Sequence, residues 1–257
     1  MSASALAGRR VVVTRPAGQA AHMAALIRAA GGEPLLFPAL EIFDVGDAPP
    51  LRALIERLES FDLAIFISAN AVTKALALVR ARRDWPPALR VATVGRGSER
   101  ELERHGFAEV IAPSERFDSE GLLELPQLQQ VAGKRVVIFR GEGGRELLGE
   151  TLAARGAKVE YAECYRRGRP NTDPAPLLAQ CARRGLDAFT VTSSEGLANL
   201  HAIMGEAGRQ CLQNTPLFAP HERIAAAARA LGVQTVVLTG PGDEGLVAGL
   251  AAFFAKV

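Results

Sequence analysis

The feature that most constrains the fold of this chain is a regular alternation of short apolar segments with longer helical patterns. Runs rich in valine, isoleucine and phenylalanine alternate with segments in which apolar residues recur at helical spacing. Such alternation is typical of βα units around a largely parallel sheet. We expect ten strands, at residues 11–15, 33–37, 63–68, 90–95, 109–113, 135–140, 158–165, 188–193, 215–220 and 234–239.

These strands form two sets of five with the same internal spacing. An offset of 125 residues superposes the first set on the second and matches identical residues in both. The matched pairs are Arg15 with Arg140, Gly31 with Gly156, Asp62 with Asp187, and Ser68 with Ser193. We therefore interpret the chain as two copies of a five-stranded α/β unit.

The second strand of each copy bears on how the chain divides into domains. Residues 34–43 and 158–167 are both longer than a usual strand of about 5 to 6 residues. One interpretation is that both strands pass from one domain to the other as a two-stranded linker, so that each domain takes segments from both copies. The other is two consecutive domains divided near residues 131–134. The pattern alone leaves both open.

Composition and charge exclude several classes of protein. Of 257 residues 48% are hydrophobic, enough for substantial cores, while 30 basic and 28 acidic residues give a net charge of +2. No nucleic-acid partner is expected, because no basic run is long enough for a nucleic-acid footprint. No membrane association is expected either, since no segment approaches the roughly 20 apolar residues of a membrane span. Residues 1–10 lack a signal-peptide pattern, so we expect a cytoplasmic protein.

The cysteines and histidines give no sign of a metal site. Cys164, Cys181 and Cys211 are too far apart for a Cys-x-x-Cys motif and too few for a disulfide framework. We expect three buried, reduced thiols. The four histidines show no ligand spacing with one another or with the cysteines, so no metal is expected.

The segments that follow the expected strands are rich in serine, glycine and arginine. Ligands of parallel α/β sheets bind beyond the carboxyl ends of the strands, where helix N-termini present free backbone N–H groups. Serine and glycine are also ordinary helix caps and turn residues, but together with the arginines they favour a ligand with several carboxylates or phosphates. The candidates are Arg15, Ser68, Ser98, Arg140, Gly141, Ser193, Ser194 and His221.

Nucleotide-binding motifs are not supported. Residues 240–245 have the Gly-x-Gly-x-x-Gly spacing, but too few residues follow for the second strand of a dinucleotide-binding unit. The glycine-rich loop at residues 141–144 lacks the lysine of a P-loop. No Ser-His-Asp or Cys-His set stands out. Pattern and spacing alone therefore indicate a two-lobed anion-binding α/β protein.

The order of several short motifs is more specific. These are Thr-Arg-Pro at residues 14–16, Phe-Pro-Ala-Leu-Glu-Ile at 37–42, Phe-Ile-Ser-Ala-Asn-Ala-Val at 66–72, Asp-Ser-Glu-Gly-Leu at 118–122, Thr-Ser-Ser-Glu-Gly at 192–196 and Pro-His-Glu-Arg-Ile at 220–224. Over essentially its whole length the chain resembles the uroporphyrinogen-III synthase family. The resemblance implies two flavodoxin-like parallel-sheet domains joined by a two-stranded β linker. The implied domains are residues 1–36 with 168–257, and residues 43–160, with linker strands at 37–42 and 161–167.

The resemblance also implies a function, that of a lyase of haem biosynthesis. The family closes hydroxymethylbilane, a linear tetrapyrrole, to uroporphyrinogen III with inversion of ring D and loss of water, and it needs no cofactor. The enzyme's main task is then conformational control, because the spontaneous reaction closes the ring without inversion. By the same resemblance we expect a monomer that makes transient contact with the preceding pathway enzyme.

Residue roles follow from the same resemblance. The family's usual candidate for assisting hydroxide departure is a tyrosine that maps onto Tyr165, with packing of the linker as the alternative role. Family positions that line the cleft map onto Ser68, Ser98, Arg140, Ser193 and His221. The family often has threonine where Ser98 and His221 stand, and His221 either contacts a carboxylate or caps its helix.

Two other classes of protein remain as alternatives. A non-catalytic two-lobed binding protein for a small polyanionic ligand would need only the anion-binding turns. A flavodoxin-like redox domain is disfavoured by the duplication and by the scarcity of aromatic residues, since Trp85 is the only tryptophan.

Overall fold

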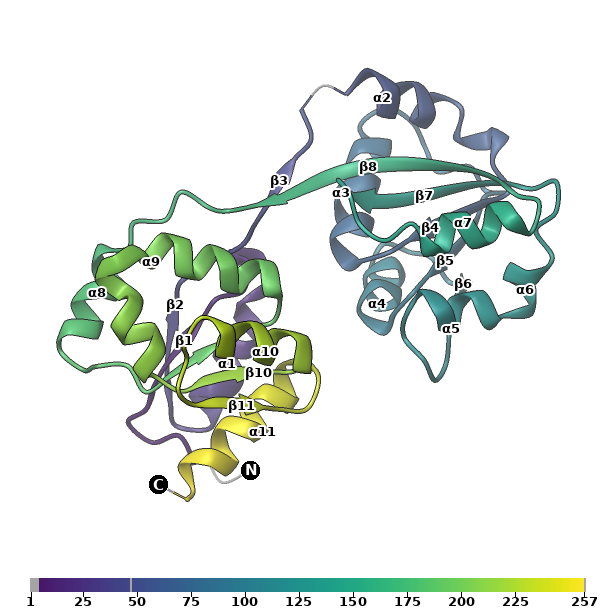
Figure 1. The fold of residues 1–257 in the computed structure, drawn as a ribbon. Coiled ribbons are helices and arrows are strands. Elements are labelled where there is room, and N and C mark those ends of the chain that lie inside the picture. The colour runs from purple at the N-terminus through teal and green to yellow at the C-terminus, as the bar shows by residue number, and fades with distance from the viewer. Residues whose placement is uncertain (1–4, 47, 257) are drawn as a thin grey trace. The chain divides into compact units, whose positions relative to one another are not determined.

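The chain folds into two compact units, each with its own sheet. The computed structural model describes residues 5–46 and 48–256. Unit 1 takes its residues from Met1–Glu41 and Gly168–Val257, and unit 2 comprises Ile42–Arg167. Figure 1 shows that in each unit helices pack on both faces of a central sheet.

Unit 1 is built on five parallel strands in the order β11-β10-β9-β1-β2. The strands are β1 (Arg10–Val13), β2 (Glu33–Leu36), β9 (Ala188–Thr190), β10 (Leu217–Ala219) and β11 (Val236–Leu238). The helices are η1 (Ala17–Gln19), α1 (Ala21–Ala29), α8 (Ala175–Ala182), α9 (Ser194–Asn214), α10 (Glu222–Ala230) and α11 (Gly242–Phe254). Helix α9 is interrupted at Gly205, where φ is 57°.

The alternation of side chains along β1 explains how unit 1 is layered. Val12 points into a core formed with α8, α9 and α10. Val11 and Val13 point to the opposite face, where they pack against α1 and α11. Because both faces of a parallel sheet are buried, all three valines are fully inaccessible to solvent.

Unit 2 has six strands in the order β3-β8-β7-β4-β5-β6. The strands are β3 (Glu41–Asp44), β4 (Leu63–Phe66), β5 (Arg90–Thr93), β6 (Val110–Ile111), β7 (Arg135–Gly141) and β8 (Lys158–Gly168). The helices are α2 (Pro49–Glu56), η2 (Leu58–Ser60), α3 (Ala69–Arg80), α4 (Arg96–Arg104), α5 (Ser119–Glu124), α6 (Pro126–Gln129) and α7 (Leu147–Ala154).

The two faces of the unit 2 sheet carry separate cores. Phe66 and Phe139 stack with ring centroids 4.9 Å apart on the face covered by α2, α3 and α4, and Trp85 packs against this core. Ile65 and Ile138 lie on the other face, which α5, α6 and α7 cover. The strands alternate between these two cores residue by residue.

The fold class expected from the sequence, α/β with largely parallel sheets, is confirmed. All ten expected strands overlap strands of the structure, but residues 34–43 are not one continuous strand. The chain instead forms β2 and β3 with a break around Pro38, which has no N–H to donate to a sheet. Phe37 and Ala39 beside it are buried in the core of unit 1.

The duplication is visible in matching hydrogen bonds. Asp187 accepts the backbone N–H of Arg10 at 2.8 Å, which fixes the start of β1 beside β9. Asp62 accepts the backbone N–H of Arg135 at 2.7 Å and fixes the start of β7 beside β4 in the same way. The first two strands of each copy therefore pair with the last three strands of the other. The two-stranded linker itself stays a prediction.

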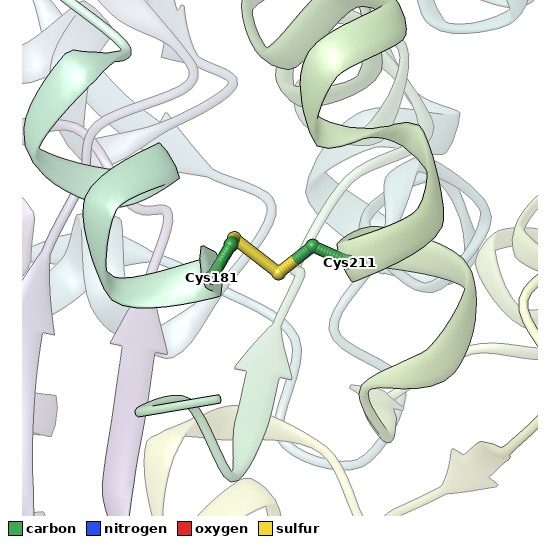
Figure 2. Close-up of a disulfide and its surroundings, with 2 residues drawn as sticks. All are labelled: Cys181 and Cys211. Carbon is green, nitrogen blue, oxygen red and sulfur yellow. A yellow bond between two sulfur atoms is a disulfide. The ribbon is translucent and has the colours of Figure 1, made fainter. Parts of the chain in front are cut away.

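A disulfide joins two helices of unit 1 and corrects the expectation of three free thiols. Cys181 of α8 and Cys211 of α9 are bonded, with Cα atoms 5.7 Å apart (Figure 2). The fold brings the two helices side by side, although 30 residues separate the cysteines in the sequence. Cys164 is free and buried, and burial raises the pKa of its thiol to about 12.

Candidate active site

In unit 2 the structure brings Tyr165 of β8 against the turn that follows β4. The hydroxyl oxygens of Tyr165 and Ser68 are 3.1 Å apart, and either can be the donor. Ser68 is the N-cap of α3, and its oxygen also accepts the backbone N–H of Ala71 at 3.1 Å. Tyr165 itself is only 4% exposed, so packing fixes its ring while the phenol is joined to a helix N-terminus.

Gly141, the last residue of β7, lies directly against the ring of Tyr165. A Cβ atom at this position would be 2.6 Å from Cε2 and 2.7 Å from Cζ of that ring. The next backbone N–H, from Glu142, donates to the carbonyl oxygen of Tyr165 at 2.8 Å. Three of the residues singled out from the sequence, Ser68, Gly141 and Tyr165, are thus in contact.

Arg140 precedes Gly141 in β7, and its side chain points to the other face of the sheet. Its side chain is buried, donates to Glu146 at 3.0 Å and to Glu163 at 3.3 Å, and lies 4.1 Å from the ring centroid of Tyr161. Both carboxylates are close to half-exposed. The guanidinium is therefore already neutralised, and an incoming carboxylate must compete with Glu146 and Glu163.

The two tyrosines of the chain differ in what their phenols can do. Burial and the hydrogen bond to Glu146 raise the pKa of Tyr161 to about 12. The same hydrogen bond, followed by that from Arg140, lowers the pKa of Glu146. The phenol proton of Tyr161 is thus committed to an internal carboxylate, whereas Tyr165 is bonded to a hydroxyl group that can itself donate.

In unit 1, two serines lie at the carboxyl end of β9. Ser193 is the N-cap of α9 and accepts the backbone N–H of Gly196 at 2.9 Å. Ser194 begins the helix, and its buried hydroxyl has no hydrogen-bond partner among the residues that the structure describes. A buried hydroxyl without a partner carries an energetic cost.

Arg15 follows β1 at the same edge of the unit 1 sheet. Its Nη2 is 2.9 Å from Oδ1 of Asp243, a buried residue in the first turn of α11. The other oxygen of Asp243 is 3.2 Å from Nδ1 of His22. Arg15 is therefore held by a carboxylate, as Arg140 is in unit 2.

The last two candidates occupy the first turns of helices. Ser98 lies in α4, which begins at the N-cap Gly95, and it is only 5% exposed. His221 is the N-cap of α10 and is exposed, but its side chain makes no capping hydrogen bond. Helix capping, one of the two roles left open for His221, is thus not what its side chain does here.

Membrane and metal features can be judged over residues 5–46 and 48–256. None of the helices in this range is long and apolar enough to cross a membrane. No three His, Cys, Asp or Glu side chains in it are grouped so that they could hold a metal ion.

Comparison with known proteins supplies the family. The profile of the family described as uroporphyrinogen-III synthase HemD matches residues 21–248. A uroporphyrinogen-III synthase of Salmonella typhimurium is 37% identical over 236 residues, which cover 91% of this chain and 96% of that protein. The Escherichia coli uroporphyrinogen-III synthase is 34% identical with the same coverage. The chain belongs to the uroporphyrinogen-III synthase family.

Solved structures of uroporphyrinogen III synthases have the same fold. A mutant of the Thermus thermophilus enzyme superposes with a TM-score of 0.61 at 21% identity, covering 97% of this chain and all of that one. The Helicobacter pylori protein gives a TM-score of 0.58 at 14% identity, covering 96% and 98% of the two chains. The family and the lyase function of haem biosynthesis expected from the sequence are confirmed.

Within this uroporphyrinogen-III synthase fold, sequence reasoning missed the partners of both arginines. It did not anticipate that Asp243 holds Arg15, or that Glu146 and Glu163 hold Arg140. One available signal was the parallel alignment of the strands at residues 135–140 and 158–165, because Glu163 is the direct neighbour of Arg140 in that register. No comparable signal marked Asp243, which lies in the segment rejected as a nucleotide motif.

Proposed function

We propose that this chain closes hydroxymethylbilane to uroporphyrinogen III, inverting ring D and releasing water, and that Tyr165 assists the departure of the hydroxyl group. The observation that carries the assignment of Tyr165 is its hydrogen bond to Ser68 at the carboxyl end of the unit 2 sheet. Ligands of parallel α/β sheets bind at this end.

The hydrogen bond leaves the phenol free to act as a donor. The oxygen of Ser68 accepts the N–H of Ala71, and its own proton can be donated to the oxygen of Tyr165. Tyr165 can then give its proton to the terminal hydroxyl of the substrate, which leaves as water. Ring closure and aromatisation of the last pyrrole release one proton, which restores the phenol. The reaction therefore balances without a cofactor.

The carboxylates of the substrate are bound by helix N-termini more than by free cations. Ser68 and Ser193 cap α3 and α9, where backbone N–H groups and the helix dipole favour negative charge. Arg140 contributes when a substrate carboxylate displaces Glu146 or Glu163. That the sheet edges of both units bind one substrate molecule stays a prediction, as do a monomer, a cytoplasmic location and contact with the preceding pathway enzyme.

The test is the rate at which the purified protein forms the inverted isomer from enzymatically generated hydroxymethylbilane, with the isomers resolved by chromatography. Tyr165→Phe keeps the ring and removes the donor, so it should fold as wild type by circular dichroism. We expect its rate to fall by about 100-fold or somewhat less, the lower range of general-acid assistance, because water or a substrate carboxylate can substitute in part.

A matched variant strengthens this test. Tyr161→Phe also removes one phenol from β8, but that phenol is bonded to Glu146. We expect a clearly smaller loss than for Tyr165→Phe. Wild-type rates in a folded Tyr165→Phe protein would refute the role of Tyr165. A wild-type protein that forms only the isomer without inversion would refute the activity itself.

A further inference from the structure

The side chains of β8 alternate between the two faces of the unit 2 sheet until the strand reaches Cys164. Val159 and Tyr161 pack into the core beneath α5, α6 and α7. Ala162 and Cys164 belong to the opposite core, with α2, α3 and α4. A regular strand would therefore turn Tyr165 to the face of Tyr161, away from α3 and its cap Ser68.

The structure instead places Tyr165 in the same core as Cys164, because β8 has a bulge at this point. Arg140 pairs with Glu163, but the next residue of β7, Gly141, pairs with Tyr165. Two residues of β8 thus oppose a single step of β7, with Cys164 as the extra residue. The thiol of Cys164 is buried and lies 3.3 Å from the carbonyl oxygen of Arg140, so the bulge is filled and hydrogen-bonded.

Gly141 leaves the space that the ring of Tyr165 needs on this face of the sheet. Because it has no side chain, the ring of Tyr165 lies over its Cα, in the space that a Cβ would occupy. The hydrogen bond between the hydroxyls of Ser68 and Tyr165 then holds the hydroxyl end of the ring. The bulge in the strand decides which face of the sheet the ring lies on. The glycine sets how closely the ring approaches β7, and the serine sets the direction of the phenol hydroxyl.

We propose that the β-bulge at Cys164, the bare Cα of Gly141 and the hydroxyl of Ser68 form a positioning device that turns Tyr165 across the sheet and holds its phenol at the N-terminus of α3. Gly141 and Ser68 are then positioning residues that act through Tyr165. This inference rests on the proposed role of Tyr165, and it changes the role expected for Gly141 from substrate binding to seating of the ring.

A double-mutant cycle tests the device. Ser68→Ala removes the hydrogen bond to Tyr165 together with the cap on the N–H of Ala71, and it should lower the rate of inverted-isomer formation by about 2- to 10-fold. Gly141→Ala forces the ring from its place, and misplacement by about 1 Å can cost up to about 100-fold. In a Tyr165→Phe background, where there is no hydroxyl to position, either change should lower the rate clearly less than it does in the wild type, and the loss that remains for Ser68→Ala is that of the α3 cap. If either change lowers the rate in that background by as much as it does in the wild-type protein, the proposal is overturned.

Nuclear magnetic resonance gives a readout that does not depend on activity. The chain has only two tyrosines, so ¹³C-tyrosine labelling yields two sets of ring signals, and Tyr165→Phe assigns them. Ser68→Ala and Gly141→Ala should shift the Cζ signal of Tyr165 and leave that of Tyr161 in place. A Tyr165 signal that neither variant moves would overturn the proposal, even if both variants lose activity.

A control variant and a second cycle cover the case in which a main variant does not fold or does not lose activity. Gly18→Ala is the matched control, because its added Cβ meets nothing within 4 Å, and it should keep wild-type rate and spectrum. If Gly141→Ala does not fold, Ser68→Ala alone completes a cycle with Tyr165→Phe. Wild-type activity of Tyr165→Phe would refute the catalytic role of Tyr165, and the tyrosine spectrum would still decide whether Gly141 and Ser68 hold the ring.

Discussion

Reduction of the disulfide between Cys181 and Cys211 should destabilise unit 1 and leave unit 2 unchanged. The two cysteines are 30 residues apart in the sequence, and a closed loop of that length restricts the unfolded chain by about 3 to 4 kcal/mol in the chain-entropy model. Domains are typically stable by about 5 to 15 kcal/mol, so this is a substantial part of the stability of unit 1.

The position of the only tryptophan separates the two units experimentally. Trp85 packs against the core of unit 2 that contains Phe66 and Phe139, so its fluorescence follows the unfolding of that unit. Far-UV circular dichroism follows the helices of both units. Because each unit has its own hydrophobic cores, we expect two transitions in urea and not a single two-state curve.

The assay is urea unfolding with and without a reductant, recorded by both probes. With a urea m-value of about 1 to 3 kcal/mol/M, reduction should lower the midpoint of the circular dichroism transition of unit 1 by about 2 M. The fluorescence midpoint should stay in place. In a Cys181→Ala/Cys211→Ala variant the reductant should have no further effect, and thiol counts after denaturation should rise from one to three on reduction of the wild type. An equal shift of both probes, or none, would refute the reasoning.

Three further predictions concern charged side chains of the two units. Asp187→Ala should destabilise unit 1 by about 2 kcal/mol, because Asp187 accepts a hydrogen bond from the backbone at the start of β1. Asp62→Ala should destabilise only unit 2, and by less, because its hydrogen bond to the backbone of Arg135 is more exposed. Urea unfolding curves recorded with the two probes distinguish the units. The hydrogen bond from Arg57 lowers the pKa of Glu160, so this pair stabilises unit 2 fully above the ordinary carboxyl pKa of about 4.3, and the stabilisation is lost as pH falls through the lowered pKa. Glu160→Gln should therefore weaken the pH dependence of the urea midpoint that tryptophan fluorescence reports in acid, and an unchanged pH dependence would contradict this. Arg140→Ala should lower kcat/KM by about 10-fold or more, a larger loss than for the serine caps, and initial rates at several substrate concentrations that show no loss would remove Arg140 from the site.

The sequence was sufficient for the features that depend on periodicity. Buried parallel strands are apolar on both faces, so β1, β4, β7 and β9 appear as short apolar runs between helical patterns. The caps Ser68 and Ser193 were equally predictable, because a serine before a helix is there to accept an N–H three residues on. The order of such turns was enough to identify the family.

Other features depend on contacts between distant segments and left no local signal. The bulge at Cys164 follows from how β8 pairs with β7, and a strand with an extra residue looks like any other strand in the sequence. The disulfide depends on α8 and α9 packing side by side. The interruption after β2 was marked by Pro38, but the apolar residues around it favoured a continuous strand because they are buried in the core of unit 1.

The duplication gives a last argument about which residues carry the chemistry. An offset of 125 residues preserves the two capping serines, and it preserves the two arginines, each held by acidic partners. The same offset relates Tyr165 to Leu40, so the phenol has no counterpart in the other copy. The residues proposed to bind anions are thus shared by the two copies, as a polycarboxylate substrate requires, whereas the proposed proton donor is found in one. A reaction in which a single hydroxyl leaves needs only one such donor, and the asymmetry supports Tyr165 as that residue.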